Sequence, residues 1–523
     1  MKAFAGLLDR LSFQPRRLGK LRLIEDYFAT TPDPDRGYAL AAMTRGLTFR
    51  HAKPALIRGL VNERVDPVLF ELSYDYVGDL AETVALIWPT PTEAPAPPPS
   101  LGEVVTRLRD TGKAALPGLL AGWLDALDVT GRWALIKLMT GGLRIGVSAR
   151  LAKTAFAGFG NLAVDDVEEI WHGQAPPYEA LFAWAESRGG RPAVRAAGGF
   201  RPVMLAQALD EAGLSGLDAS AYLAEWKWDG IRVQLSAGDG VVRLYTRAGD
   251  DIGGGFPDLL AAVDFGAVLD GELLVIRDGA VAPFGDLQKR LNRKTVSGRL
   301  QRAFPVGVRL YDILFDGGDD LRDLPLGDRR ERLEAWFAAR RPAGFDLSPL
   351  VPFDDWPTLA ELRRAPPVDG VEGLMLKRRD SVYVAGRPKG PWFKWKRDPL
   401  LADAVLMYAR RGHGKRSPYY SDYTFGVWRG DELVPVGKAY FGFTDAELVE
   451  LDRWVRNNTI NRFGPVREVS RGLVLEVAFD GVRESGRHKS GLALRFPRIN
   501  RIRWDKPVAE ADAIEALLAR LPC

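Results

Sequence analysis

The sequence predicts a multidomain protein with an all-α N-terminal domain, a central α+β domain with antiparallel sheets, and a C-terminal β-barrel. At 523 residues the chain is long enough for about three domains. Apolar residues recur at helical spacing through residues 1–200, and from about Tyr222 the pattern changes to short alternating strands. Strand patterns return after Pro399. We therefore expect domains at residues 1–200, 201–399 and 400–523.

The first 200 residues contain several runs with the apolar spacing of amphipathic helices. These runs are LRLIEDYFATT, ALAAMTRGL, PALIRGLV, LFELSYDYVGDLAETVALI and RWALIKLMTGGL. Acidic or small polar residues stand near several of their starts and glycines near their ends, as at helix termini. The segment PTPTEAPAPPPS, Pro89 to Ser100, has few backbone donors and can pack little. It is predicted to be a loop or spacer between two helical groups.

A Gly-Ser turn in GGLRIGVSARLAK, Gly141 to Lys153, is flanked by Arg144, Arg150 and Lys153. One interpretation is a solvated helix-turn-helix. The other is a corner that grips phosphate, because backbone amides at a helix start would lie beside arginines. The residues alone leave both interpretations open.

The rest of the chain combines strands with a few helices. VVRLYTRAGDDI, AVLDGELLVI and VGVRLYDILFDGG are β-rich and end in Gly or Asp turns, with the helical pattern DRRERLEAWFAARR between elements. After Pro399 strands return in LADAVLMYARR, DYTFGVWRGDELVPVGKAYFG and LVLEVAFDGVRES, with a helix DAELVELDRWVRNN among them. A small barrel of this length with an inserted helix is typical of an OB-fold. AEADAIEALLARL is predicted to form a C-terminal amphipathic helix.

Composition excludes several classes of protein. The net charge is only +4, but basic residues gather between Arg378 and Arg397 and between Arg483 and Lys506. The sole cysteine, Cys523, excludes an internal disulfide framework and a cysteine-rich zinc site. MKAFAGLLDRLSFQ lacks the apolar run of a signal peptide, and no stretch is apolar enough to cross a bilayer. We expect a cytoplasmic protein without a membrane partner.

The segment AEWKWDGIRVQL, Ala224 to Leu235, carries the first predicted chemistry. It reads as a strand, a turn at Asp229-Gly230, and a second strand. Lys227 therefore ends a strand, two residues before Asp229 and five before Arg232. A lysine amine becomes a nucleophile when neighbouring cations and partial burial hold it neutral. Taken alone, the same letters also fit an ordinary surface turn.

Further motifs in the β-rich part carry chemistry of the same kind. An arginine at a strand end could hold phosphate or ribose, carboxylates could bind Mg²⁺, an aromatic could stack on a base, and lysines could offset phosphate charge. Each also has an ordinary reading, as a surface arginine, a turn carboxylate, a core aromatic or lysines of an edge strand. The residues are Arg247 in YTRAGDD, Glu272 in LDGE, Tyr311 in LYDILFDGG, Glu372 in EGLMLK, and Lys394 and Lys396 in WFKWK.

The order KxDG, Arg, DGE, aromatic-Asp-Ile, EGxMxK and KxK resembles that of the covalent nucleotidyltransferases, and here the ATP-dependent DNA ligases. The helical region with LRIGVS, Leu143 to Ser148, is similar to the DNA-encircling N-terminal domain of archaeal and eukaryotic-type ligases. RPVMLAQAL, Arg201 to Leu209, resembles the segment leading into their adenylation domain. RFPRINRIRWDK, Arg495 to Lys506, is similar to the last ligase motif of the OB domain, so the resemblance covers essentially the whole chain.

The resemblance implies a reaction in three phosphoryl transfers. Lys227 would take AMP from ATP, pass it to the 5′-phosphate of a nick, and the 3′-hydroxyl would then displace AMP and seal the strand. It implies ATP and Mg²⁺, or Mn²⁺, as cofactors, and nicked duplex DNA as the partner of a monomer that encircles it. Repair, replication and recombination of nucleoid DNA are the processes that such an enzyme serves.

The resemblance also implies residue roles, with Lys227 as the nucleophile. Glu225 would contact adenine and Tyr311 would stack on it, while Glu272 and Glu372 would bind the metal ion. Arg495 and Arg498 would orient pyrophosphate when the OB domain closes about a hinge near Asp398 to Leu401. The remaining nucleotide contacts implied are Arg232, Arg247, Glu272, Arg387, Lys394 and Lys396, and the DNA contacts are Arg144, Asp229 and Lys377.

Three details depart from the family pattern. Position 311 is Tyr where many ligases have Phe, so its hydroxyl needs a partner. YTRAGDD matches the second motif only loosely, and in GRPKGPW the phosphate contact could be Arg387 or Lys389, of which Arg387 is favoured.

Alternative functions share part of this pattern. An NAD-dependent ligase would carry a four-cysteine zinc site, which a single cysteine cannot form. An RNA ligase or a capping-type nucleotidyltransferase has the lysine core, but the long helical region favours a duplex DNA clamp. A non-catalytic DNA-binding scaffold is the alternative from another class, although every expected catalytic position holds a competent residue.

Overall fold

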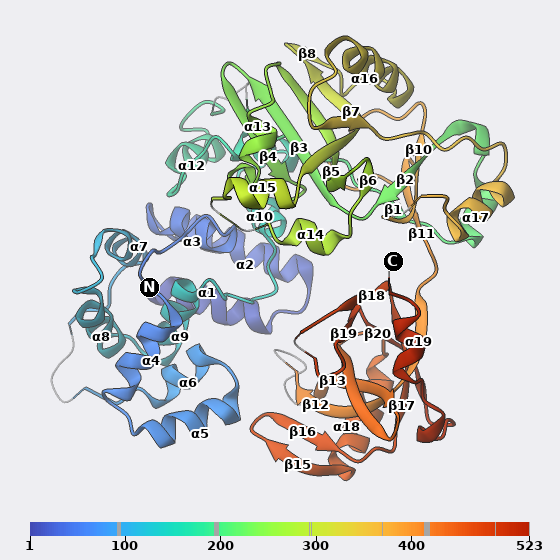
Figure 1. The fold of residues 1–523 in the computed structure, drawn as a ribbon. Helices are drawn as coiled ribbons and strands as arrows, with labels where there is room; N and C mark the ends of the chain where they lie inside the picture. The colour runs from blue at the N-terminus through green and yellow to red at the C-terminus, as the bar shows by residue number, and fades with distance from the viewer. Residues whose placement is uncertain are drawn as a thin grey trace. The chain divides into compact units, whose positions relative to one another are not determined.

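Helices come first along the chain and strands dominate after Gln207 (Figure 1). Contacts divide the described residues into two compact units: Met1–Phe159 with Pro176–Glu179 and Pro399–Cys523, and Gly160–Ala175 with Ala180–Asp398. The computed structural model describes residues 1–91, 96–192, 198–291, 293, 295–368, 370–412, 419–486 and 488–521.

The predicted helical character of the N-terminal region is confirmed. The long predicted run LFELSYDYVGDLAETVALI is broken at Gly78, whose φ of 76° ends one helix, and Asp79 caps the next by accepting from Ala81 and Glu82. The predicted spacer lies between α6 and α7, and its residues 92–95 are outside the described residues. The helices are α1 (Lys2–Phe13), α2 (Arg17–Thr30), α3 (Asp35–Met43), α4 (Pro54–Asn62), α5 (Pro67–Val77), α6 (Leu80–Ile87), α7 (Leu101–Asp110), α8 (Leu116–Ala126), α9 (Val129–Thr140), α10 (Ala149–Phe159), α11 (Val164–Trp171) and α12 (Glu179–Ala185).

The central region contains two sheets that pack on each other. In the described residues, one sheet has the order β1-β11-β10-β2, and the other has β4-β3-β5-β7-β8 with β6 and β9 at its sides. The predicted antiparallel pairing is found throughout except at β1 with β11 and β7 with β9, which are parallel. Leu274 of β5 lies in the apolar core of the smaller sheet, so the sheets share a buried interface.

Helices cover the outer faces of these sheets. Leu333 and Trp336 of α16 are buried in the core of the larger sheet, and Leu359 of α17 is buried against the smaller one. The elements are β1 (Gln207–Ala208), β2 (Tyr222–Trp228), β3 (Ile231–Gly238), β4 (Val241–Thr246), α13 (Pro257–Leu260), β5 (Ala267–Arg277), β6 (Ala280–Val281), α14 (Phe284–Gln288), α15 (Gly298–Ala303), β7 (Val306–Asp316), β8 (Asp319–Asp320), α16 (Leu326–Arg340), β9 (Phe345–Leu347), α17 (Trp356–Arg364), β10 (Val371–Arg378) and β11 (Trp392–Lys396).

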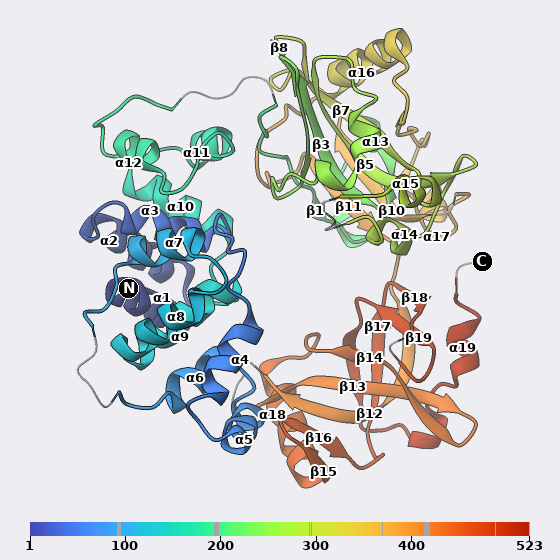
Figure 2. The same ribbon diagram turned by 60° about the vertical axis from the view of Figure 1, so that its left-hand side comes forward.

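The C-terminal region is a curled β domain, seen from a second side in Figure 2. Its long strand β12 pairs on one side with β13, and on the other first with β17 and then with β16, which bends the sheet. Thr444 and Glu447 form a capping box that starts the inserted helix α18. The elements are β12 (Leu400–Arg411), β13 (Tyr420–Arg429), β14 (Glu432–Ala439), α18 (Asp445–Asn457), β15 (Thr459–Phe463), β16 (Val466–Val469), β17 (Val474–Phe479), β18 (Gly481–Glu484), β19 (Leu492–Arg495), β20 (Arg498–Arg503) and α19 (Ile514–Leu518).

The predicted C-terminal helix is shorter than its sequence pattern. The backbone of Asp512 donates to the carbonyl of Asp403 and accepts from Trp428, so this part of the chain is extended beside the sheet. Only Ile514–Leu518 remains α-helical.

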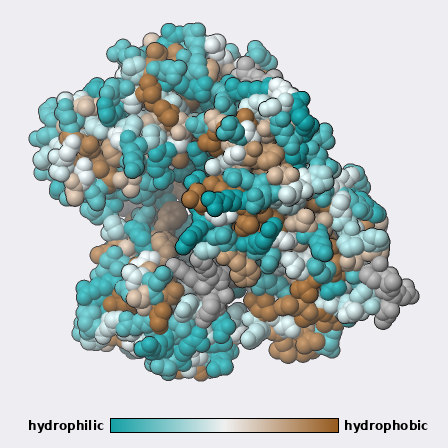
Figure 3. All heavy atoms as spheres, turned by 180° about the vertical axis from the view of Figure 1, so that it is seen from behind, coloured by the Kyte–Doolittle hydropathy of each residue, from teal (hydrophilic) through white to brown (hydrophobic). Residues whose placement is uncertain are grey.

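The surface is mostly hydrophilic, with separate apolar patches on the face shown in Figure 3. Helix α5 exposes Val68, Leu69, Leu72 and Tyr76. In the described part of the chain, the helices are too short or too polar to span a membrane.

Candidate active site

Lys227 lies near the end of β2, where a bulge in the neighbouring strand brings a carboxylate to it. The β2–β10 register shifts between Val371 and Leu374, and Gly373 there has a φ of 145°. A Cβ at Gly373 would lie 2.3 Å from the carbonyl oxygen of Trp395, so only glycine fits the bulge. Lys227 Nζ donates to Glu372 Oε2 at 2.5 Å.

Glu372 is the point where several predicted residues meet. Lys396 Nζ lies 3.4 Å from the same carboxylate oxygen that Lys227 contacts. Burial raises the pKa of Glu372, but Lys227, Lys396 and a hydrogen bond with the Asp229 side chain outweigh it and hold the pKa at about 2. The carboxylate is therefore ionised at neutral pH and available as a hard oxygen donor.

Four other predicted cations gather around Lys394. Burial lowers the pKa of Lys394, and the charges of Arg387, Lys396, Lys227 and Arg247 lower it further. These cations come from β2, β11, the turn after β4 and the segment between β10 and β11. A concentration of positive charge on half-buried walls favours a polyanion such as a triphosphate.

Glu272 stands beside this cluster on β5, directly opposite Arg232 of β3. Burial raises the pKa of Glu272 to about 8, against the opposing charges of Lys227 and Arg232 and with help from Asp270 and Glu372. Without a bound cation the carboxyl is therefore largely protonated at neutral pH. Glu272 and Glu372 are close enough to influence each other's ionisation.

This raised pKa predicts a pH-dependent stability difference between the parent and Glu272→Gln. The pKa in the folded chain is about 8 and the ordinary value is 4.5, so the stability from this carboxyl is complete below pH 4.5 and is lost as the pH rises through 8. Glutamine cannot ionise, so the variant avoids this loss.

We expect the melting temperature of nucleotide-free Glu272→Gln to exceed that of the parent increasingly between about pH 5 and pH 8, and the difference to level off above about pH 9. Thermal unfolding followed by fluorescence across this range measures it. The control is Glu361→Gln, an exposed glutamate on α17. A difference that is constant with pH would contradict the buried location of Glu272.

The predicted adenine contacts, Glu225 and Tyr311, both lie close to Lys377. Glu225 on β2 and Lys377 on β10 are diagonal neighbours in the sheet, and Lys377 Nζ donates to Glu225 Oε1 at 3.0 Å. Lys377 Nζ also lies 4.3 Å from the centroid of the Tyr311 ring. Burial raises the pKa of the Tyr311 phenol well above its ordinary value.

The position of Lys377 differs from the DNA contact expected of it. The side chain is only 2% exposed and its charge is already paired with Glu225. The ammonium group therefore lies in a buried cluster with Glu225 and Tyr311, away from a surface that a DNA backbone could reach.

A network that the sequence did not predict holds Arg232. Asp270, which is fully buried, accepts from Arg232 Nε at 3.0 Å and from Nη2 at 2.5 Å. The Tyr383 hydroxyl donates to Asp270 at 2.7 Å and lies 3.1 Å from Arg232 Nη2. Asp270 could have been found, because it lies two residues before Glu272 on one strand and so shares its face. Tyr383 lies outside any strand and gave no signal.

The remaining predicted residues belong to the other compact unit. Arg144 is exposed between α9 and α10, in a loop that Lys20 fixes by donating to the carbonyls of Ile145 and Gly146 at 2.7 and 2.9 Å. Arg495 ends β19, and Arg498 on β20 donates to Asp480 at 3.0 Å. The structure therefore joins the central motifs into one cluster within their own unit, and these three arginines belong to the other unit.

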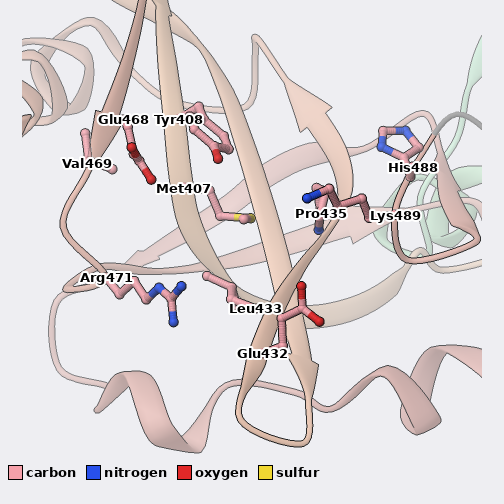
Figure 4. A pocket seen from close by; sticks show the side chains of 10 residues that line it. All are labelled: Met407, Tyr408, Glu432, Leu433, Pro435, Glu468, Val469, Arg471, His488 and Lys489. Atoms are coloured by element: carbon pink, nitrogen blue, oxygen red, sulfur yellow. The ribbon is translucent and has the colours of Figure 1, made fainter. Parts of the chain in front are cut away.

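A separate hollow of about 340 Å³ lies on the C-terminal β domain (Figure 4). Its floor includes Met407, Leu433 and Pro435, and charged side chains such as Glu432 and Arg471 surround it. The residues that line it were not predicted as site residues, and it is distinct from the lysine cluster.

Two models of known protein families match the chain, one in its central region and one in its C-terminal region. A model described as an ATP dependent DNA ligase domain matches residues 203–396. A second, described as an ATP dependent DNA ligase C terminal region, matches residues 416–506. The first match contains the lysine cluster, and the second contains Arg495 and Arg498.

Individual relatives extend the similarity over the helical region. The chain is 36% identical over 431 residues to a probable DNA ligase of Koribacter versatilis, covering 77% of this chain and 74% of the relative. It is 29% identical over 554 residues to DNA ligase 1 of Korarchaeum cryptofilum, covering 98% of this chain and 97% of the relative. A solved structure described as "Pmar-Lig_PreS3" is 16% identical, covers 96% of this chain and 99% of its own, and has a TM-score of 0.61. That likeness shows a shared fold.

Proposed function

The chain belongs to the ATP-dependent DNA ligases, and from this premise we propose how its residues carry out the reaction. A DNA ligase of this family uses ATP to seal nicks in duplex DNA, and RNA joining or capping is not favoured. The observation that carries the residue assignment is Lys227, held between Glu372 and a group of cations around Lys394.

In the first step Lys227 Nζ attacks the α-phosphorus of ATP. The N–P bond forms as the bond between the α-phosphorus and pyrophosphate breaks, and the neutral amine releases one proton to solvent and keeps one N–H in the phosphoramidate. Lys227 forms an ion pair with Glu372 before the reaction, so its proton must leave before the attack. Lys394, Lys396, Arg247 and Arg387 offset the charge of the departing pyrophosphate.

The second and third steps use the same cationic surroundings. An oxygen of the 5′-phosphate attacks the adenylate and Lys227 leaves with a proton. The 3′-hydroxyl then attacks the activated 5′-phosphate and AMP departs. Each step is an in-line phosphoryl transfer, in which the protein positions groups and neutralises charge.

The site also contains residues suited to bind the adenine base and a divalent metal ion. Tyr311 stacks on adenine, Glu225 contacts it, and the Asp270–Tyr383 network aims Arg232 at the nucleotide. Glu372, ionised, and Glu272, whose ionisation a cation would favour, are donors that Mg²⁺ or Mn²⁺ accepts together with substrate phosphates. The ion would supply positive charge that stabilises the transferring phosphoryl group.

The surrounding regions supply DNA contacts and movement. We assign the C-terminal domain, with its curled sheet and inserted helix, to the OB-fold class. Arg495 and Arg498 orient pyrophosphate when this domain closes about the link at residues 398–401. In this proposal the protein is a monomer that encircles nicked DNA, and Asp229 contacts the DNA or the metal ion.

Incubation with labelled ATP and Mg²⁺, followed by nicked duplex DNA, tests the proposed function. The protein becomes labelled, and the label leaves it as DNA is sealed. A chain that is labelled by GTP in preference to ATP would be a capping-type enzyme, and one that stays unlabelled would be a DNA-binding scaffold. Label that is discharged onto nicked RNA and not onto DNA would indicate an RNA ligase.

Arg144→Ala tests the phosphate-gripping corner of the helical region. We expect weaker binding to nicked duplex at all sequences and a salt dependence whose log–log slope is smaller by about 1, since one phosphate contact is lost. Labelling by ATP alone stays unchanged. Fluorescence anisotropy at several salt concentrations measures the slope. Lys113→Ala, an exposed lysine outside this corner, is the matched control. An unchanged slope in Arg144→Ala would favour the solvated helix-turn-helix.

A further inference from the structure

Two adjacent aromatic rings are exposed where β14 ends. Tyr440 is 64% exposed and Phe441 is 40% exposed. Their ring centroids are 5.3 Å apart with an interplanar angle of 60°. A contiguous pair of exposed aromatic side chains is a candidate binding surface.

The backbone under this pair is fixed to the neighbouring strand. The amide of Ile499 on β20 donates to the carbonyl of Phe441 at 3.1 Å. Gly442, with a φ of 102°, follows directly, and a Cβ there would lie 2.1 Å from the Ile499 carbonyl oxygen. Only glycine permits this close approach. The rings are therefore presented by an ordered backbone, which lowers the entropy lost on binding.

The surroundings of the pair are basic. Lys438 is exposed on β14, two residues before Tyr440 in the sequence. Arg483 lies on β18 opposite Ala493 of β19, and β19 packs beside β14, the strand that carries Lys438. Burial lowers the pKa of the His488 imidazole, and the charges of Lys438 and Arg483 lower it further. Arg498, next to Ile499, donates to Asp480. Aromatic rings beside cations form the surface that single-stranded nucleic acids bind, through stacked bases and a charged backbone.

We propose that Tyr440 and Phe441 stack on unpaired bases of DNA beside the break. Inside an intact duplex each base face is covered by its neighbours, so a protruding ring finds free faces only where bases are unpaired. Lys438 and Arg483 contact the phosphates of the same strand. The inference rests on the proposed ligase function and names a substrate class for it: broken DNA with a single-stranded stretch, such as an overhang.

The test compares two DNA substrates with the full-length protein. One is a nicked duplex that is paired throughout, and the other has a short stretch of unpaired bases next to the nick. Anisotropy measures the binding of the parent and the Tyr440→Ala/Phe441→Ala double variant. We expect roughly 5- to 150-fold weaker binding of the unpaired substrate, the usual loss when base stacking is removed, and a change below about twofold for the paired one.

Three controls separate this inference from the function itself. Labelling by ATP without DNA reports on folding and on the ligase chemistry, and it stays within about twofold of the parent. Phe463→Ala removes another exposed ring, on β15 at the far end of the strand order from β14, and keeps the parent's binding of both substrates. Phe441→Tyr keeps a stacking ring and the parent's binding.

Two results would overturn the inference. One is a loss on the unpaired substrate smaller than about fivefold. The other is an equal loss on both substrates. A parent protein that takes no label from ATP would instead overturn the proposed function.

Discussion

Lys227→Ala takes up no adenylate from ATP. The methyl group of alanine cannot form the N–P bond, and Lys394 and Lys396 on β11 are assigned to offsetting phosphate charge and not to attack. Removal of a catalytic nucleophile lowers the rate of the chemical step by at least about 10⁴-fold, because the other residues of the site act only together with it. Labelling with ATP and Mg²⁺, followed by mass spectrometry of the adduct, measures the loss. In the parent protein the adduct is at position 227.

The same variant keeps most of its affinity for nicked DNA, because one half-buried lysine contributes little to a DNA interface. The matched control is Lys289→Ala, an exposed lysine directly after α14, which is labelled normally. Label that persists on Lys227→Ala would identify a different nucleophile. Loss of DNA binding together with labelling would indicate that the variant does not fold.

The local patterns predicted where elements lie, because each depends on neighbours in the chain. The helical spacing of the N-terminal runs and the alternation around Lys227 required no distant contact. The break at Gly78 and the shortened C-terminal helix were missed for different reasons. Gly78 ends a helix through its left-handed backbone, whereas the backbone of Asp512 pairs with Asp403 and Trp428, which are remote in sequence.

The candidate site was predicted differently, through the order of motifs. That order predicted that Lys227, Glu272 and Glu372 belong to one active site, but it did not predict which contacts hold them together. The meeting itself depends on the bulge at Gly373, which places Glu372 beside the lysine. Tyr383 and the burial of Lys377 could not be predicted, because both follow from packing between the sheets and the segment after β10.

Asp312→Ala has the largest expected effect on stability. Asp312 on β7 and Arg329 on α16 are both 0% exposed, and the carboxylate accepts from Arg329 Nε at 2.8 Å and Nη2 at 2.9 Å. Arg329 Nη1 also donates to the carbonyls of Leu324 and Ser381, at 2.6 and 3.0 Å. The alanine variant leaves a buried guanidinium without its counter-charge, which costs about 3–5 kcal/mol.

The loss is measured as the change in unfolding free energy in urea and as a lower melting temperature. A matched control is Asp346→Ala on the neighbouring strand β9, which removes the partner of Arg309 on β7. That pair has a similar two-pronged geometry, at 3.0 and 2.6 Å, but side-chain exposures of 12% and 40%. Asp346 is partly exposed, so water can reach the place of the lost carboxylate and partly solvate Arg309, and this variant loses less than the Asp312 variant, about 1 kcal/mol.

The two variants are also expected to differ in their effect on the active site. Asp312 follows Tyr311 on β7, and the Ser381 carbonyl that Arg329 holds lies two residues before Tyr383, the partner of Asp270. We therefore expect Asp312→Ala, at temperatures below its unfolding, to need more ATP for half-maximal labelling, while Asp346→Ala needs as much as the parent. Equal stability losses in the two variants would show that burial does not distinguish the pairs. In that case the Asp312–Arg329 pair would not be what fixes helix α16 and the Tyr383 segment to the sheet.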